Sequence, residues 1–419
     1  METWPSLLLK NVPLQNGRSG DVAIEGGKVG HIGAGQYADT IIDCTGCLVL
    51  PAAVDMHVHM RGGKQSAKED WASGSRSAIA GGVTVVVDQP NTHPPLTIPA
   101  LFSERVHEAR RHSFCNFAIN SSVTPDTSLG AMWKAGAMAF GEIFCAPSSY
   151  GKAVGGHELT RAFGQIAGLG ALATIHAERL NDGPDTSLTS HDTLRSSEGE
   201  VQAIHAIQRC NTSECPLHFC HLSTARSIDA AAGTVEVTPH HLFLSREQFP
   251  LSETRVKVNP PLRKESERKD LWARWKRIDV IASDHAPHTA AEKDLPFPEA
   301  PSGVPGVETM VPLLLTEVLN RKITLSDLII KTSQAPAQLL GIPPAGFATG
   351  NRADFALFPK TPVRIDADKL HSRCGWTPYE GRMAVFPSVV IRDGKIVYRE
   401  GEFFRHEPVW FAGKGYVPP

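Results

Sequence analysis

His57, His59 and Arg61 are the residues of this sequence whose types and spacing most directly suggest chemistry. His57 lies in Val54–Val58, a short apolar stretch that is predicted to form a buried strand, and His59 and Arg61 follow that stretch. Because alternate residues of a strand point to the same side, His57 and His59 project together and form half of a metal site. Arg61 continues that face and offers a planar fork for a carboxylate. An isolated pair of histidines is more often structural, so the interpretation depends on the rest of the chain.

Other polar residues stand at or just after the ends of apolar stretches. Those that could bind a metal ion are two further histidines and a carboxylate: His176, His221 and Asp284. Side chains that could hold an anionic substrate are placed in the same way: Asn91, Asn259 and His288. The imidazole nitrogens and carboxylate oxygens of this set suit zinc, with manganese, cobalt or iron as alternatives.

These residues can meet only if the chain brings the ends of many strands to one place. Apolar, β-rich runs alternate with helical patterns such as Ala67–Ala80, Glu158–Leu169 and Glu200–Arg209. Eight runs are predicted to be strands: Val54–Val58, Val83–Asp88, Asn116–Val123, Met138–Phe144, Leu172–His176, Leu217–His221, Thr234–Val237 and Val280–Ser283. Eight such units predict an α/β fold, a parallel (β/α)8 TIM-like barrel with its active site at the carboxyl ends of the strands.

The two ends of the chain have a different pattern from the middle. Short strands with turn signals fill residues 1–50, where Gly26-Gly27 marks a hairpin. The pattern returns near the other end in three predicted strands: Phe355–Phe358, Met383–Arg392 and Lys395–Tyr398. We therefore predict a small composite β-sandwich domain built from residues 1–50 plus 350–419, and a barrel over residues 51–349.

The predicted ring of ligands favours hydrolysis of an amide-like bond. Two metal ions about 3.5–4 Å apart can activate water and polarise a carbonyl group. Asp284 would take the proton of the attacking hydroxide and pass it to the leaving nitrogen. Arg61 would grip an anionic substrate, with Asn91, Asn259 and His288 as hydrogen-bond donors.

The composition is that of an ordinary globular protein, with 41% hydrophobic and 21% charged residues among 419. The net charge of −2 indicates neither a nucleic-acid nor a membrane-surface partner. No stretch approaches the roughly 20 apolar residues of a membrane span, and the N-terminus does not have the layout of a signal peptide. Eight scattered cysteines favour reduced thiols in the cytoplasm, with Cys44 and Cys47 in a turn rather than a zinc site.

Several motifs together resemble dihydroorotase, an enzyme of the amidohydrolase superfamily, in its long (type I) form. They are His57-Val58-His59-Met60-Arg61, Gln89-Pro90-Asn91-Thr92, Asn259-Pro260-Pro261-Leu262-Arg263, Asp284-His285-Ala286-Pro287-His288, Gly306-Val307-Glu308-Thr309 and Cys374-Gly375-Trp376-Thr377-Pro378. The resemblance covers residues 45 to 395. It implies a metal-bound barrel that interconverts N-carbamoyl-L-aspartate and L-dihydroorotate in pyrimidine (UMP) biosynthesis.

The resemblance also implies roles for individual residues. His57 and His59 would bind one zinc ion with Asp284, which would also be catalytic, and His176 and His221 would bind a second. Arg61, Asn91 and His288 would hold the substrate carboxylate, with Asn259 nearby. Ser302 and Gly303 would offer backbone groups to the substrate ring.

One position departs from the common pattern of the family. Many relatives have a carboxylated lysine on the fourth strand as the bridge between metals, and here Glu142 takes that place. A glutamate has the charge of a lysine carbamate but is shorter, so it bridges only if the backbone lies closer to the metals, which Gly141 would permit. Lys134 and Lys152 are weaker candidates for the bridge. Ser148 and Ser149, in the loop that follows, are candidate lid residues.

Other functions remain open at this point. A hydantoinase or allantoinase would share the metal ligands, although Arg61 and the Pro90-Asn91-Thr92 turn favour a substrate with a carboxylate. A non-catalytic dihydroorotase-like subunit of aspartate transcarbamoylase is a third candidate, and such a subunit would be expected to lose metal ligands. A homodimer, or association of the active enzyme with aspartate transcarbamoylase, is compatible with the sequence.

Overall fold

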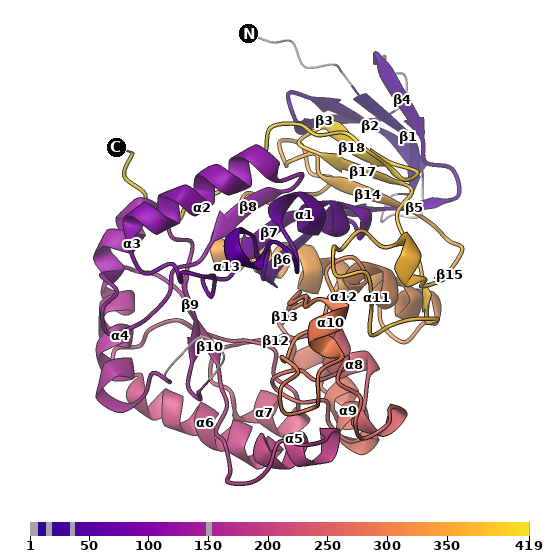
Figure 1. The fold of residues 1–419 in the computed structure, drawn as a ribbon. Coiled ribbons are helices and arrows are strands. Elements are labelled where there is room, and N and C mark those ends of the chain that lie inside the picture. The colour runs from indigo at the N-terminus through magenta and orange to yellow at the C-terminus, as the bar shows by residue number, and fades with distance from the viewer. Residues whose placement is uncertain (1–6, 14–18, 34–37, 148–152, 419) are drawn as a thin grey trace.

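A computed structural model describes residues 7–13, 19–33, 38–147 and 153–418 as a ring of strands and helices beside a separate layer of strands (Figure 1). All eight strands predicted for the ring are present: β6 (Ala53–Val58), β7 (Val83–Asp88), β8 (Asn116–Ile119), β9 (Phe140–Phe144), β10 (Ala173–His176), β11 (Leu217–Phe219), β12 (Thr234–Val237) and β13 (Val280–Ile281). Strands β8, β11 and β13 end earlier than predicted.

The strands of the ring form two parallel sheets, ordered β6-β7-β8 and β13-β12-β11-β10-β9. Parallel bridges between Ser121 and Phe140 and between Val58 and His285 connect the edges of these sheets. Neighbouring strands follow chain order and run in one direction, so their carboxyl ends meet on the same side.

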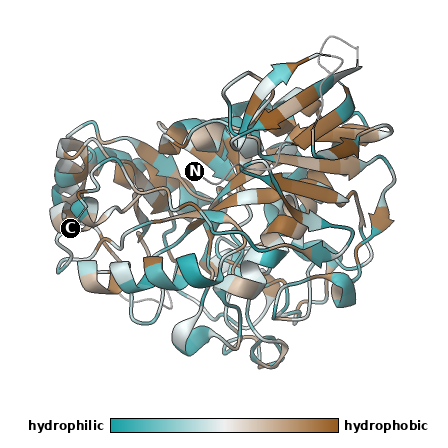
Figure 2. Cartoon of the chain, turned by 90° about the horizontal axis from the view of Figure 1, so that it is seen from above, coloured by the Kyte–Doolittle hydropathy of each residue, from teal (hydrophilic) through white to brown (hydrophobic). Residues whose placement is uncertain are grey.

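Helices cover the outside of the strands, and hydrophobic residues gather on the strands (Figure 2). Helix α1 (Trp71–Ala80) begins later than predicted, because Asp70 and Ser73 form a reciprocal capping box. The others are α2 (Pro99–His112), α3 (Leu129–Ala135), α4 (Gly156–Gly168), α5 (Leu188–Leu194), α6 (Ser197–Cys210), α7 (Ala225–Ala230), α8 (Pro239–Phe243), α9 (Glu265–Ala273), α10 (Ala290–Lys293), α11 (Met310–Leu319), α12 (Leu325–Ile329) and α13 (Ala335–Leu340). None of the helices in the described ranges is both long and apolar enough to cross a membrane.

The separate layer contains two sheets. The first is ordered β3-β2-β1-β4, from β1 (Leu7–Pro13), β2 (Ser19–Glu25), β3 (Lys28–Ile32) and β4 (Thr40–Asp43). The second is ordered β19-β18-β17-β14-β5, from β5 (Cys47–Pro51), β14 (Phe355–Pro359), β17 (Val389–Arg392), β18 (Lys395–Arg399) and β19 (Glu402–Phe403). Residues from both ends of the chain therefore share one sheet, because β5 pairs with β14.

Two segments near the C-terminus have contacts that the sequence pattern did not specify. The single strand predicted over Met383–Arg392 is wrong: β16 (Met383–Ala384) pairs with β15 (Val363–Arg364), and β17 begins only after Pro387, which has no amide hydrogen for a ladder. Residues 409–417 leave the second sheet and bond to the backbone of β8 and α3.

Candidate metal and substrate site

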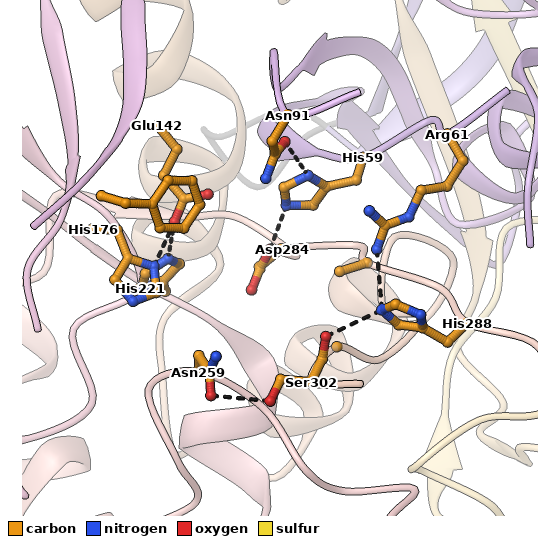
Figure 3. Close-up of a pocket in the computed structure, with 13 residues that line it drawn as sticks. His59, Arg61, Asn91, Glu142, His176, His221, Asn259, Asp284, His288 and Ser302 are labelled. Carbon is orange, nitrogen blue, oxygen red and sulfur yellow. Dashed lines mark hydrogen bonds and ion pairs between the residues drawn. The ribbon is translucent and has the colours of Figure 1, made fainter. Parts of the chain in front are cut away.

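One pocket at the carboxyl ends of the strands collects nearly all the residues predicted from the sequence (Figure 3). Its lining is His59, Arg61, Asn91, Glu142, Phe144, His176, His221, Asn259, Asp284, Ala286, His288, Ser302 and Gly303. His57 does not line the pocket, but its Nε2 lies 3.5 Å from Glu142 Oε2 and 3.6 Å from Asp284 Oδ1. Phe144 and Ala286 were not predicted as site residues. The candidate lid residues Ser148 and Ser149 lie outside the described residues.

Sharp backbone turns aim three of these side chains into the pocket. Arg61, His221 and Asp284 have φ angles of 48°, 36° and 45°, in the left-handed region that residues other than glycine rarely adopt. Such conformations cost about 1–3 kcal/mol each and persist where the surrounding structure holds them. Each of these residues lies two or three positions beyond the end of a strand of the ring: Arg61 after β6, His221 after β11 and Asp284 after β13.

A hydrogen bond from His57 to Glu236 determines which imidazole nitrogen of His57 carries the proton. His57 Nδ1 lies 3.0 Å from Glu236 Oε1, and a carboxylate only accepts, so Nδ1 donates its proton there. The buried Nε2 then has no hydrogen-bond partner and faces the oxygens of Glu142 and Asp284. A lone pair facing two carboxylates is repelled unless a positive charge lies between them, which either a proton on Nε2 or a bound metal ion would provide.

The same arrangement recurs at His59 and His176. His59 contacts Asn91 Oδ1 through Nδ1, at 2.8 Å, and Asp284 Oδ1 through Nε2, at 3.0 Å. His176 contacts Glu142 Oε1 through Nδ1, at 2.7 Å, and Glu178 Oε2 through Nε2, at 2.6 Å. A neutral imidazole donates only one proton, so its other nitrogen faces an oxygen as an acceptor: a carboxylate oxygen at His176, and the oxygen of Asn91 or Asp284 at His59. This donor set fits a divalent metal ion.

The carboxylate of Glu142 contacts three of the candidate histidine ligands. Its Oε1 lies 2.7 Å from His176 Nδ1 and 2.8 Å from His221 Nε2, and its Oε2 faces His57. Two sets of ligand atoms therefore converge, one from His57, Glu142 and His221 and one from His57, His59 and Asp284. Of the alternative bridges, Lys134 is exposed on α3 away from the pocket, and Lys152 lies outside the described residues.

Gly141 explains how a side chain as short as glutamate reaches this position. The φ of Gly141 is 130°, and a Cβ there would lie 2.1 Å from Thr174 O and 2.4 Å from Thr174 Oγ1. No other residue fits, because β9 approaches β10 too closely.

We expect Gly141→Ala to lower both stability and metal content. The added methyl group must displace β9 from β10, which typically costs about 1–3 kcal/mol of the free energy of unfolding and moves Glu142 away from His176 and His221. Thermal unfolding and metal analysis of the purified variant test this. The matched control is Gly130→Ala, since a Cβ at Gly130 on α3 meets nothing within 4 Å. Equal metal content in the two variants would contradict the expectation.

Two buried glutamates behind the ligands were not predicted as site residues. Glu236 on β12 contacts His57, His218 Nε2 at 3.1 Å and the backbone amide of His221 at 3.0 Å. Burial alone would raise the pKa of Glu178, but the charge of Arg195 and the neighbouring His176 lower that pKa to about 2. A carboxylate inside an apolar strand is the sequence feature that could have identified Glu236 as a site residue. His57, Cys220 and Glu236 also form a third cluster of candidate ligand atoms.

The opposite side of the pocket presents hydrogen-bond donors. Lys68 Nζ lies 3.1 Å from His288 Nδ1, which must accept, so His288 Nε2 carries the proton and donates it to Ser302 O at 3.1 Å. Burial lowers the pKa of His288 to about 3, a contact with Glu292 opposes this, and the charges of Arg61 and Lys68 reinforce it. Arg61 Nη2 lies 3.4 Å from His288 Nε2, so two N–H groups converge where a carboxylate oxygen could accept from both.

The remaining predicted substrate residues lie at the rim of the same pocket. Asn259 Oδ1 accepts a hydrogen bond from Ser302 Oγ at 3.0 Å. The backbone amide of Gly303 donates to Lys257 O at 2.9 Å, so it is already engaged within the protein. Gly303 is required for another reason: its φ is 136°, and a Cβ there would lie 2.5 Å from Ala286 O.

Comparisons with known proteins agree with this geometry. Residues 48–397 match the amidohydrolase family. A protein named dihydroorotase from Methanosarcina acetivorans is 39% identical over 433 positions, which span 94% of this chain and 92% of that protein. A second dihydroorotase, from Halobacterium salinarum, is 37% identical over 93% of this chain and 96% of its own length.

Solved structures of similar fold include L-hydantoinase (dihydropyrimidinase) from Arthrobacter aurescens, with a TM-score of 0.89 and 25% identity over 96% of this chain and 98% of that one. The dihydropyrimidinase of Brevibacillus agri has a TM-score of 0.87 and 23% identity over 99% of this chain and 100% of its own, which shows the shared fold alone. The chain belongs to the amidohydrolase family.

Proposed function

We propose that this member of the amidohydrolase family is a dihydroorotase, a cyclic amide hydrolase that interconverts N-carbamoyl-L-aspartate and L-dihydroorotate in pyrimidine biosynthesis. One observation carries the proposal: a cluster of metal ligands and the converging donors of Arg61 and His288 occupy opposite sides of one pocket. Such a pocket suits a substrate that bears both an amide-like bond and a carboxylate. The identity of 39% to a dihydroorotase supports the same substrate.

The ligand cluster would hold zinc. His57, His59 and Asp284 would bind one ion, His176 and His221 a second, and Glu142 would be shared between them. When bound, such ions act as Lewis acids and lower the pKa of water toward neutrality.

Asp284 would move the proton. In the hydrolytic direction a hydroxide adds to the ring carbonyl carbon, Asp284 accepts the hydroxide proton, and the carbon–nitrogen bond breaks as that proton passes to the leaving nitrogen. Asp284 Oδ1 lies 3.0 Å from His59 Nε2, and its side chain is 12% exposed, so it is held in place while it remains open to the pocket. Cyclisation uses the same steps in reverse.

The donor side of the pocket would hold the substrate carboxylate. Arg61 offers a planar, permanently charged fork, and neutral His288 donates through Nε2 after leaving Ser302 O. Asn91 accepts from His59 through Oδ1, which leaves its amide nitrogen as a donor. Asn259 would complete this wall beside Ser302.

Arg61→Met should raise the KM for both substrates by about a hundredfold or more, because a buried charge-assisted contact to a carboxylate is lost. Metal content should stay near that of the parent, since Arg61 is not among the ligands. Steady-state kinetics and metal analysis on the same samples test this. A fall in metal content at unchanged KM would instead make Arg61 a support of the metal cluster.

The decisive test of the function is a parallel rate assay of the purified protein, with metal content measured on the same sample. The substrates are dihydroorotate, N-carbamoyl-L-aspartate, hydantoin and allantoin. Metal-dependent interconversion of the first two alone supports the proposal. Turnover of hydantoin or allantoin would identify another cyclic amidohydrolase, and no turnover with bound metal would favour a non-catalytic subunit of aspartate transcarbamoylase.

We also propose a closed barrel and a composite domain for this chain. The eight strands would close into one barrel, supported by the two bridges between their sheets. Residues 1–50 plus 350–419 would form the composite domain, with residues 409–417 lying against the barrel of residues 51–349. Eight unpaired thiols support a reducing compartment such as the cytoplasm.

A further inference from the structure

We propose that Lys293, at the end of α10, is a positioning residue that holds the substrate-binding wall of the pocket from behind. The inference rests on the proposed function, since that wall is where the substrate carboxylate would bind. Lys293 is fully buried, with 0% of its surface exposed, and it was not among the site residues predicted from the sequence. Lysine is almost never fully buried unless its charge is compensated, so its surroundings require an explanation.

Backbone carbonyl groups compensate the charge. The ammonium donates to Pro301 O at 2.8 Å, Gly303 O at 3.1 Å and Lys257 O at 3.2 Å, which uses all three of its N–H donors. Within the described ranges of the chain, Lys293 forms no ion pair with a carboxylate within 4.0 Å. Its three acceptors are therefore its principal partners.

These carbonyls belong to the two segments that form the rim of the pocket. Lys257 leads into Asn259, and Pro301 and Gly303 flank Ser302. Neither segment lies in a helix or strand, so no regular ladder holds its backbone. The amide of Gly303 also donates to Lys257 O, at 2.9 Å, and the ammonium thus reinforces a direct backbone link between the segments, beside the side-chain bond from Ser302 to Asn259.

Lys293 is also connected to the third part of the wall. Its ammonium lies 5.7 Å from the ring centre of Trp376, and Trp376 Nε1 donates to His288 O at 2.8 Å. Asn259, Ser302 and His288 are therefore all supported by groups that contact Lys293. A fixed wall matters because misplacing a binding group by about 1 Å costs roughly a hundredfold in rate.

A second buried lysine provides a matched control. Lys331 is 6% exposed, donates through Nζ to Ile278 O and lies 5.4 Å from the ring centre of Trp275. It resembles Lys293 in burial, in its carbonyl acceptor and in its tryptophan neighbour. However, it supports the start of β13, at the end of the strand opposite the pocket.

The experiment compares Lys293→Met and Lys331→Met by Tm, metal content, KM and kcat with dihydroorotate and N-carbamoyl-L-aspartate. Both variants should lose stability. Only Lys293→Met should raise KM, by about tenfold or more at unchanged metal content, while Lys331→Met stays within about twofold of the parent. A parental KM in Lys293→Met, or an equal rise in both variants, overturns the proposal. Failure of the parent itself to convert either substrate would refute the proposed function instead.

A milder variant and a direct measurement cover the case in which Lys293→Met does not fold. Lys293→Arg keeps the charge but not the geometry of a compact ammonium, so we expect a smaller rise in KM, of about threefold to tenfold. Hydrogen exchange of the Gly303 amide should be faster in Lys293→Arg than in Lys331→Met, whatever the substrate is. Parental KM together with parental exchange in Lys293→Arg would contradict the positioning role.

Discussion

Replacing Asp284 with asparagine is expected to lower kcat by about 10²–10⁴-fold, the usual contribution of a positioned acid–base group. Asparagine keeps an oxygen in the place of Asp284 Oδ1, 3.0 Å from His59 Nε2, but it cannot accept a proton and return it. We therefore expect the variant to fold and to keep most of its metal while turnover is lost. Steady-state rates and metal analysis of one preparation measure both quantities.

Asp279→Asn is the control for this experiment. Asp279 lies just before β13, whereas Asp284 follows that strand, and its Oδ2 accepts a hydrogen bond from the Val235 amide at 2.8 Å. The same chemical change at the remote end of the strand should leave kcat near that of the parent. Near-normal kcat in Asp284→Asn would remove this carboxylate from the proton transfer, and loss of metal would make it chiefly a ligand.

The second large effect is expected for Glu142→Ala, which should lose at least one metal ion per chain and more than about 10³-fold in kcat. The carboxylate of Glu142 contacts His57, His176 and His221, so its removal leaves three imidazoles without the anion that they share. Equilibrium dialysis against a limiting concentration of zinc, followed by metal analysis, gives the stoichiometry.

Two comparisons make that measurement specific to the bridge. Glu142→Gln keeps the size of the side chain but not its charge, and it should also bind less metal than the parent. Glu158→Ala removes an exposed carboxylate on α4 and should bind as much metal as the parent. Unchanged stoichiometry in Glu142→Ala would mean that another group, or none, connects the two sets of ligands.

The two experiments divide the site into separable parts. Asp284→Asn should separate turnover from metal content, because a neutral oxygen still ligates but does not move protons. Glu142→Ala should lower both together, because the ions themselves depend on its charge. If both variants behaved alike, Asp284 and Glu142 would share one role as ligands.

Much of this organisation could be predicted from local sequence patterns. The eight strands of the ring were identified by their apolar, β-branched runs, because strands buried on both faces are mostly apolar. The polar residues at the strand ends followed from the rule that parallel strands converge at their carboxyl ends. His57, His59 and Asp284 were therefore predicted as ligands from their positions, and Glu142 from the resemblance to the family.

Local patterns failed where the structure depends on contacts between distant residues. Val385 donates to Pro312 O and Ser388 to Leu357 O, so the run predicted as one strand is divided between two partners. Pro387 is a local signal against one continuous strand, but the partners of the two parts are not encoded in composition. The hydrogen bonds of residues 409–417 with the backbone of β8 and the C-terminal end of α3 likewise could not be read from composition.

The sequence by itself determined which residue types stand at the ends of the strands, because side-chain periodicity and strand direction are local properties. Only the tertiary structure decided which of them touch. That Glu142 reaches three histidines depends on the close approach of β9 to β10 at Gly141. That Glu236 orients His57 and that Lys293 supports the pocket wall depend on residues 179 and 36 positions apart, respectively, coming within hydrogen-bonding distance. Such distances result from packing the whole chain, and no segment specifies them alone.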